Sequence, residues 1–110
     1  MIDVKIASNR PIGLRVLAQS MIDSGLVNFG ATLSVSYDER TINPDDFEQF
    51  PFARLVPQPK FSGIPPMFAL RRAIHKIPSK LPWLFFDDDD SFTEESAEYL
   101  VDCAIFINEF

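Results

Sequence analysis

The sequence predicts a single α+β domain of about four short strands and three main helices, with the helices packed mainly on one face of the sheet. The first observation is that segments with strand-like alternation of apolar and polar residues take turns with segments whose apolar residues recur at helical spacing. The second is that 110 residues, 46% of them apolar, suffice for one core. The third is that eight of the nine prolines fall between residues 44 and 82, so the middle of the chain must consist of short elements. We therefore expect residues 1–110 to form one domain.

The first predicted strand and helix occupy residues 2–7 and 11–24. Residues 2–7 alternate apolar and polar side chains, which is typical of a half-buried strand. In residues 11–24 the apolar side chains gather on one helical face and the charged ones on the other. We expect Ser8 or Asn9 to cap this helix and Gly25 to end it.

The next segments predict a strand, a helical turn and an edge strand. Residues 31–37 alternate without a break and predict a strand with one buried and one polar face. Asn43, followed by proline and two aspartates, predicts a short helical turn over residues 43–50. Residues 52–56 predict an edge strand because prolines flank them. The loop at 57–63 suits a mobile functional loop and a rigid connector equally well.

The last third of the chain predicts helix, strand and helix. Residues 65–77 predict a helix that the following proline ends, and residues 83–86 are wholly apolar and predict a strand buried on both faces. A third helix follows, since Ser91 and Glu94 have the spacing of a capping box. Its apolar last turns, residues 105–110, either cover the sheet or form a surface for self-association, which leaves a homodimer open.

Charge divides the chain into two parts. Residues 1–86 hold ten basic and seven acidic residues, whereas residues 87–110 hold nine acidic residues and no Lys or Arg, so the two parts carry +3 and −9. Four consecutive aspartates open the acidic part. Glu94, Glu98 and Asp102 follow at a spacing that places them on one helical stripe. Like charges repel at this spacing, so the stripe requires cations nearby.

Two sources of those cations are open. The same chain offers six basic residues between 54 and 80, with no acidic residue among them. Alternatively, the stripe faces outward and meets a partner protein with a basic surface, such as a nucleic-acid-binding protein or complex. On the second view we predict a small, non-enzymatic protein that binds and inhibits or neutralises such a partner, of the toxin- or nuclease-immunity or anti-defence type. The predicted partner-binding residues are Asp87, Asp88, Asp89, Asp90, Glu94, Glu98 and Asp102.

Two other functions remain as alternatives. The first is a nucleic-acid-binding module that uses the basic segment 54–80, although the net charge of −6 argues against direct binding of nucleic acid. The second is a small enzyme whose pocket the sequence does not reveal. A nucleophile–base pair of Cys103 and His75 is disfavoured because acidic neighbours suppress the thiolate form of a cysteine. We predict no catalytic residues.

No cofactor or metal site is predicted. Neighbouring side chains of an extended segment point in opposite directions, so at most two of the four aspartates would meet one ion. The run also lacks the spacing of a calcium-binding loop. The first residues lack the pattern of a signal peptide, and no apolar run approaches the roughly 20 residues of a membrane span. We therefore expect a cytoplasmic protein that does not bind membranes.

Overall fold

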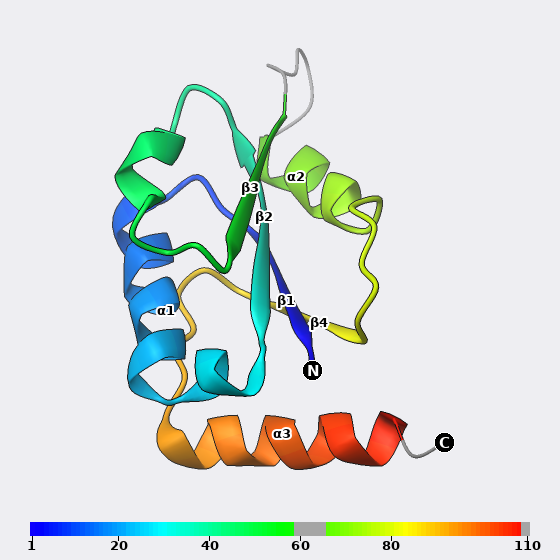
Figure 1. Ribbon diagram of the computed structural model, residues 1–110. Coiled ribbons are helices and arrows are strands. Elements are labelled where there is room, and N and C mark those ends of the chain that lie inside the picture. Colours follow the sequence, from blue (N-terminus) through cyan, green and yellow to red (C-terminus); the bar gives the residue numbers. More distant parts are fainter. Residues whose placement is uncertain (59–65, 109–110) are drawn as a thin grey trace.

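The computed structural model describes residues 1–58 and 66–108, and in this part of the chain four parallel strands form one sheet (Figure 1). The strands are β1 (Asp3–Ala7), β2 (Thr32–Asp38), β3 (Ala53–Gln58) and β4 (Trp83–Phe86). Their order across the sheet is β3-β2-β1-β4. β1 is therefore central and pairs with both β2 and β4, so that Val4 lies opposite Leu33 and Leu84.

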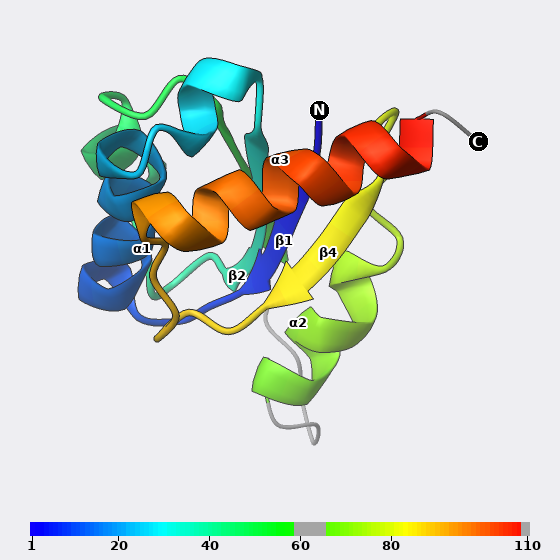
Figure 2. The same cartoon turned by 90° about the horizontal axis from the view of Figure 1, so that it is seen from below.

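Three α-helices and two short 3-10 helices connect the strands in the described residues. They are α1 (Pro11–Asp23), η1 (Leu26–Phe29), η2 (Pro44–Phe47), α2 (Pro66–Ile74) and α3 (Glu94–Asn108). α1 and α2 lie on opposite sides of the sheet, and α3 crosses the end at which β1 begins (Figures 1 and 2). The predicted α+β class, with four strands and three main helices, is confirmed. None of the described helices is long and apolar enough to cross a membrane.

One hydrophobic core joins the sheet to α1 and α3. The alternation along β1 turns Val4 and Ile6 toward this core, and both are fully buried. α1 contributes Leu14, Leu17, Ala18 and Met21, and α3 contributes Ala97 and Leu100. Burial of one such leucine or methionine side chain stabilises the fold by about 1.5–3 kcal/mol. α1 thus covers one face of the sheet, α2 lies on the other, and α3 crosses the end at which β1 begins, so the helices are not gathered on one face.

The opposite face of β1 and β2 is polar and nevertheless buried, so the prediction of half-buried strands is wrong. Asp3, Lys5 and Ser34 are each at most 4% exposed. The reason is that α2 and the residues after it cover this side of both strands. Hydroxyl groups of Thr32, Ser34 and Ser79 donate to the Asp3 carboxylate over 2.6–3.1 Å, which replaces the water that burial removes.

Lys5 links the central strand to the end of α2. Its Nζ donates to the carbonyl oxygens of Ile77 at 2.6 Å and Ile74 at 3.4 Å, and lies 4.4 Å from the centre of the Trp83 ring. The last carbonyls of a helix lack partners within the helix, and the helix dipole favours a cation there. The buried ammonium group therefore satisfies acceptors that the end of α2 leaves open.

The two outer strands differ in how well the sequence predicts them. β3 lies at an edge as predicted, and Pro57 is tolerated in it because an edge strand needs no ladder donor there. β4 also lies at an edge, which corrects the prediction that residues 83–86 are buried on both faces. Trp83 is 40% exposed and Leu84 is 41% exposed, since β4 pairs only with β1 among the described strands. Most of the predicted loop at 57–63 lies outside the described residues.

The beginning of α1 differs from the prediction, whereas its end agrees. Arg10 is the N-cap residue and makes no capping hydrogen bond with its side chain, so the prediction that Ser8 or Asn9 caps α1 is wrong. Both of those side chains bind residues near the ends of other strands instead. Gly25 follows the helix with a φ of 84°, a left-handed conformation that glycine adopts at little cost.

The capping box of α3 lies two positions further along the chain than predicted. The Ser96 N–H donates to Thr93 Oγ1 at 3.1 Å, and the Thr93 N–H donates to Ser96 Oγ at 2.8 Å. These are the reciprocal bonds that the sequence predicts for Ser91 and Glu94. The predicted cap of η2 is confirmed, since the side chain of Asn43 accepts a backbone N–H at 3.1 Å.

Candidate functional site

The chain connections create a switch point at the carboxyl ends of β1 and β4. The connection from β1 to β2 passes through α1 on one side of the sheet, and α2 precedes β4 on the other side. In open parallel sheets, ligands bind outside the carboxyl ends of the strands where the direction of winding reverses. Residues 8–10 follow β1 at this point, and the four aspartates follow β4. The Ser8 hydroxyl donates to the Asp88 carboxylate at 2.8 Å, so the two segments meet.

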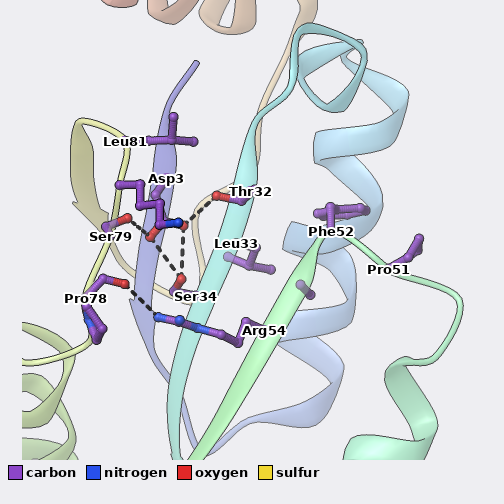
Figure 3. Close-up of a pocket in the computed structure, with 12 residues that line it drawn as sticks. Asp3, Thr32, Leu33, Ser34, Pro51, Phe52, Arg54, Pro78, Ser79 and Leu81 are labelled. Carbon is purple, nitrogen blue, oxygen red and sulfur yellow. Dashed lines mark hydrogen bonds between the residues drawn. The ribbon is translucent and has the colours of Figure 1, made fainter.

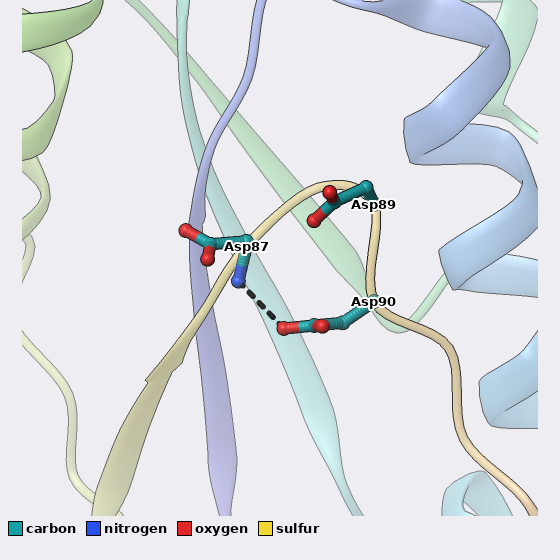
Figure 4. A group of neighbouring side chains, drawn as sticks. All are labelled: Asp87, Asp89 and Asp90. Atoms are coloured by element: carbon teal, nitrogen blue, oxygen red, sulfur yellow. Dashed lines mark hydrogen bonds between the residues drawn. The ribbon is translucent and has the colours of Figure 1, made fainter.

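The aspartates form a tight turn (Figure 4). The Asp90 N–H donates to the carbonyl oxygen of Asp87 at 3.1 Å, and the Asp87 N–H donates to Asp90 Oδ2 at 3.0 Å. Asp87, Asp89 and Asp90 are exposed, and each offers a carboxylate oxygen within 4.8 Å of those of the other two. The prediction that at most two of these aspartates meet one ion assumed an extended segment, whereas the segment is a turn. Oxygen donors in this arrangement suit a hard divalent cation.

Asp88 points the other way, into the fold. Its carboxylate accepts hydrogen bonds from Ser8 and from Arg10, whose Nε lies 3.0 Å from Oδ2 and whose Nη2 pairs with Oδ1. The bond from Arg10, helped by the Ser8 hydroxyl, lowers the pKa of Asp88, although burial opposes the shift. The same contact raises the pKa of Arg10. A charged pair therefore ties the aspartate turn to the loop after β1.

A second carboxylate lies at the carboxyl end of β2. Asp38 is 1% exposed and accepts the Arg40 N–H at 3.0 Å and the Arg40 Nε–H at 2.8 Å. This contact raises the pKa of Arg40. Asn9 Oδ1 accepts the Asp38 N–H at 3.0 Å and the Thr41 hydroxyl at 3.1 Å, which joins the ends of β1 and β2. Hydrogen bonds thus connect the segments at the carboxyl ends of β4, β1 and β2.

Sequence reasoning missed the contribution of residues 8–10 and Asp38 to this edge. The signal was present, because polar residues directly after predicted strands of a parallel sheet gather at one edge. Ser8 and Asn9 are predicted only as helix caps, and Asp38 follows a predicted strand that ends at residue 37. Of the predicted site residues, the four aspartates do lie at this edge.

The remaining predicted residues lie elsewhere. Asp88 contacts Arg10 at the first end of α1, whereas Glu94 and Glu98 line, with Asp23, a hollow at the other end. Those ends are about 20 Å apart in a helix of 13 residues. The stripe of α3 is exposed and makes no ion pair with other described residues. Its residues are Glu94, Glu98 and Asp102. The seven acidic residues therefore do not form one surface, and their contact with a protein partner stays a prediction.

The basic segment is partly engaged within the fold. Arg71 lies 3.7 Å from Asp87 in an exposed ion pair, and Arg54 donates to the carbonyl oxygen of Pro78 at 3.0 Å. His75 stacks on Phe85, with ring centres 5.7 Å apart, on the side of the sheet that α2 covers. Cys103 lies on α3, and among the described residues no hydrogen bond or ring contact joins it to His75, the other residue of the disfavoured nucleophile–base pair.

The pocket drawn in Figure 3 opens at the other edge of the sheet, where the strands begin. Its volume is about 470 Å³, and Asp3, Arg54 and Ser79 are among the residues that line it. The three hydroxyl donors described above already satisfy its buried carboxylate. A more apolar pocket of about 530 Å³ lies between β4 and α3. Both are candidates for binding. The first lies away from the switch point, whereas Phe86 and Asp90 line the second, which therefore borders the aspartate turn.

Comparison with known proteins finds similar folds among solved structures. No family model matches the chain, and no curated protein matches it. The crystal structure of Staphylococcus aureus TarS 1-349 has a TM-score of 0.62 and 19% sequence identity over 98% of this chain and 32% of that chain. The structure of TarS 1-349 in complex with UDP-GlcNAc has a TM-score of 0.55 and 17% identity over 98% of this chain and 31% of that chain. The chain thus spans about a third of the length of the TarS 1-349 chains that it matches, and it is similar to that part in fold.

This similarity corrects the function predicted from the charge pattern. TarS is a glycosyltransferase, and the likeness to its fold extends over nearly all of this chain. The interpretation of the chain as an acidic, non-enzymatic inhibitor of the immunity or anti-defence type is therefore wrong. The physical reason is that the aspartate run, on which that interpretation depended, is the turn at the switch point and has one of its carboxylates built into the fold.

Proposed function

We propose that the carboxyl edge of this sheet binds a nucleotide sugar, as the nucleotide-binding part of a glycosyltransferase-like enzyme. One observation carries the proposal: a turn whose three exposed carboxylates lie within 4.8 Å of one another is at the switch point of a sheet whose fold is similar to part of TarS, a protein solved with UDP-GlcNAc. The proposal takes up the alternative of a small enzyme and departs from the prediction that the chain is not one.

A divalent cation is part of the proposal because of charge. Three exposed carboxylates repel a diphosphate, so a nucleotide diphosphate can approach this edge only if a cation lies between them. Mg²⁺ and similar ions are held by a few carboxylates together with water and substrate phosphates, and the oxygen set of Asp87, Asp89 and Asp90 fits that requirement. When bound, such a cation neutralises charge on the diphosphate and on the nucleotide that leaves after sugar transfer.

The chain's own residues have distinct tasks in this proposal. Asp87, Asp89 and Asp90 hold the cation, and the turn bonds between Asp87 and Asp90 keep their carboxylates together. Arg71, which lies 3.7 Å from Asp87, limits the negative charge that the nucleotide meets.

The test is calorimetric titration of the chain with UDP-GlcNAc and with UDP, each with and without Mn²⁺. We expect binding that requires Mn²⁺, and we expect the double variant D89N/D90N to lose at least tenfold in affinity, about 1.4 kcal/mol. The matched control is E94Q/E98Q, which removes the same charge from exposed positions at the other end of α1 and should bind as the wild type does. Absence of binding by the wild type, or equal binding by D89N/D90N, would contradict the proposal.

A further inference from the structure

The four consecutive aspartates are not equivalent. Asp88 is 5% exposed, whereas Asp87, Asp89 and Asp90 are all exposed. Each of the three exposed residues offers a carboxylate oxygen within 4.8 Å of those of the other two, whereas the buried carboxylate binds Arg10 and Ser8 beside α1. A role for Asp88 must therefore differ from that of its neighbours.

Three contacts hold Asp88 in this orientation. The guanidinium of Arg10 binds both carboxylate oxygens, a two-pronged geometry that fixes direction as well as distance. The Ser8 hydroxyl donates to the same carboxylate at 2.8 Å and accepts the backbone N–H of Arg10 at 3.1 Å. Ser8 therefore links Asp88 to the backbone of the loop after β1. Each of these partners precedes Asp88 by more than seventy residues in the chain.

The backbone of the turn also packs directly on α1. A Cβ atom added to Gly13, in the first turn of α1, would lie 3.0 Å from the carbonyl oxygen of Asp88. That distance is tighter than nearly all real Cβ contacts. Glycine at this position therefore permits α1 to contact the backbone of the turn. Arg10 and Ser8 bind the side chain of Asp88 at the same place.

We propose that Arg10 and Asp88 are positioning residues for the cation and nucleotide site, and that their ion pair holds the turn in the conformation in which Asp87, Asp89 and Asp90 converge. The inference rests on the proposed function and adds to it the residues that shape the site from behind. Neither Arg10 nor Asp88 contacts the cation in this arrangement. Groups that orient metal ligands typically change metal affinity by about 10–100-fold when they are removed.

The charge of Arg10 and its positioning role predict opposite effects of its removal on cation affinity, so the two can be distinguished. Removing a positive charge beside a cation site should strengthen cation binding if charge alone matters. If Arg10 acts through the position of Asp88, the variant Arg10→Gln should weaken Mn²⁺ binding by about 10–100-fold. Arg10→Lys keeps the charge but not the two-pronged contact, so it should also bind Mn²⁺ more weakly than the wild type.

The experiment measures Mn²⁺ binding by electron paramagnetic resonance in the wild type, R10Q, R10K and G13A, with circular dichroism to confirm folding. Water-proton relaxation of bound Mn²⁺ provides a second readout, because a cation held by fewer carboxylates keeps more water and relaxes more protons. We expect weaker binding and higher relaxation per bound ion in all three variants. R10K guards against the case in which R10Q fails to fold, since it retains the charge at a largely exposed side chain.

The outcomes separate this inference from the function on which it rests. A wild-type chain that binds Mn²⁺ neither alone nor with UDP-GlcNAc overturns the proposed function itself. A wild type that binds Mn²⁺, together with folded R10Q and R10K that bind it equally well or more tightly, overturns only the positioning role. Weaker binding by R10Q supports the positioning role over charge alone.

Discussion

At the scale of single residues, Tyr37 is a titratable core residue whose pKa burial changes. It lies near the carboxyl end of β2 and is 2% exposed. Burial raises the pKa of its phenol, and the neighbouring charge of Glu39 acts in the same direction. Both causes disfavour the phenolate, because a charge loses hydration in the core and is repelled by a carboxylate.

The consequence is a loss of stability at alkaline pH. Because the pKa of Tyr37 is higher in the folded state, its contribution to stability is complete below the ordinary tyrosine value of about 10 and is lost as pH rises through the raised pKa. We expect absorbance at 295 nm to place the titration of Tyr37 above about 10 when the curve of Tyr37→Phe is subtracted from that of the wild type. A midpoint at or below that value would show that the phenol is not shielded from water.

At the scale of elements, the attachment of α2 to the sheet depends on a buried cation. Lys5 Nζ bridges the carbonyl oxygens of Ile74 and Ile77, and Trp83 of the edge strand covers it. A charged donor in a dry environment forms stronger hydrogen bonds than one in water. One side chain of β1 therefore holds both the end of α2 and the beginning of β4.

Replacing this lysine should loosen both elements. We expect Lys5→Met, which keeps the apolar stem, to destabilise the fold by about 1–3 kcal/mol because the hydrogen bonds from the ammonium group to the Ile77 and Ile74 carbonyl oxygens are lost. Urea denaturation measures the change, and fluorescence of Trp83, the only tryptophan, reports on the packing of β4. The control is Lys76→Met on an exposed lysine, which should change stability by no more than about 0.5 kcal/mol. Equal stability of the two variants would show that Lys5 does not stabilise the attachment of α2 and β4.

At the scale of the whole molecule, the two ends of the sheet have different character. The end at which the strands begin holds the pocket lined by Arg54 and Lys80, with a satisfied carboxylate at its floor. The carboxyl end has the converging aspartates and the switch point. Topology favours the carboxyl end for a nucleotide, although the other end has the clearer hollow.

This difference predicts where UDP-GlcNAc binds. We expect the double variant R54Q/K80Q to bind UDP-GlcNAc and Mn²⁺ as the wild type does in calorimetric titration, because its changes lie at the end remote from the switch point. D89N/D90N, measured beside it, should lose binding. If R54Q/K80Q loses affinity while D89N/D90N keeps it, the nucleotide binds in the pocket at which the strands begin.

What the sequence determined by itself is the set of elements and their local patterns. The helix at residues 11–24, the strand at 31–37 and the cap at Asn43 follow from contacts between near neighbours, which periodicity and capping chemistry report directly. The α+β class followed from the order of those elements. The charge of the aspartate run is also visible in the sequence without any knowledge of the fold, and a functional role for it stays a prediction.

What only the tertiary structure decided depends on pairings between distant segments. Strand order placed the polar faces of β1 and β2 under α2 and left the apolar β4 at an edge, which reversed the burial predicted for both. The same order brought Arg10 and Ser8 against Asp88, so that one aspartate became part of the fold and three remained at the switch point. Local sequence cannot report such contacts, because the burial of a side chain is set by whichever remote element packs against it.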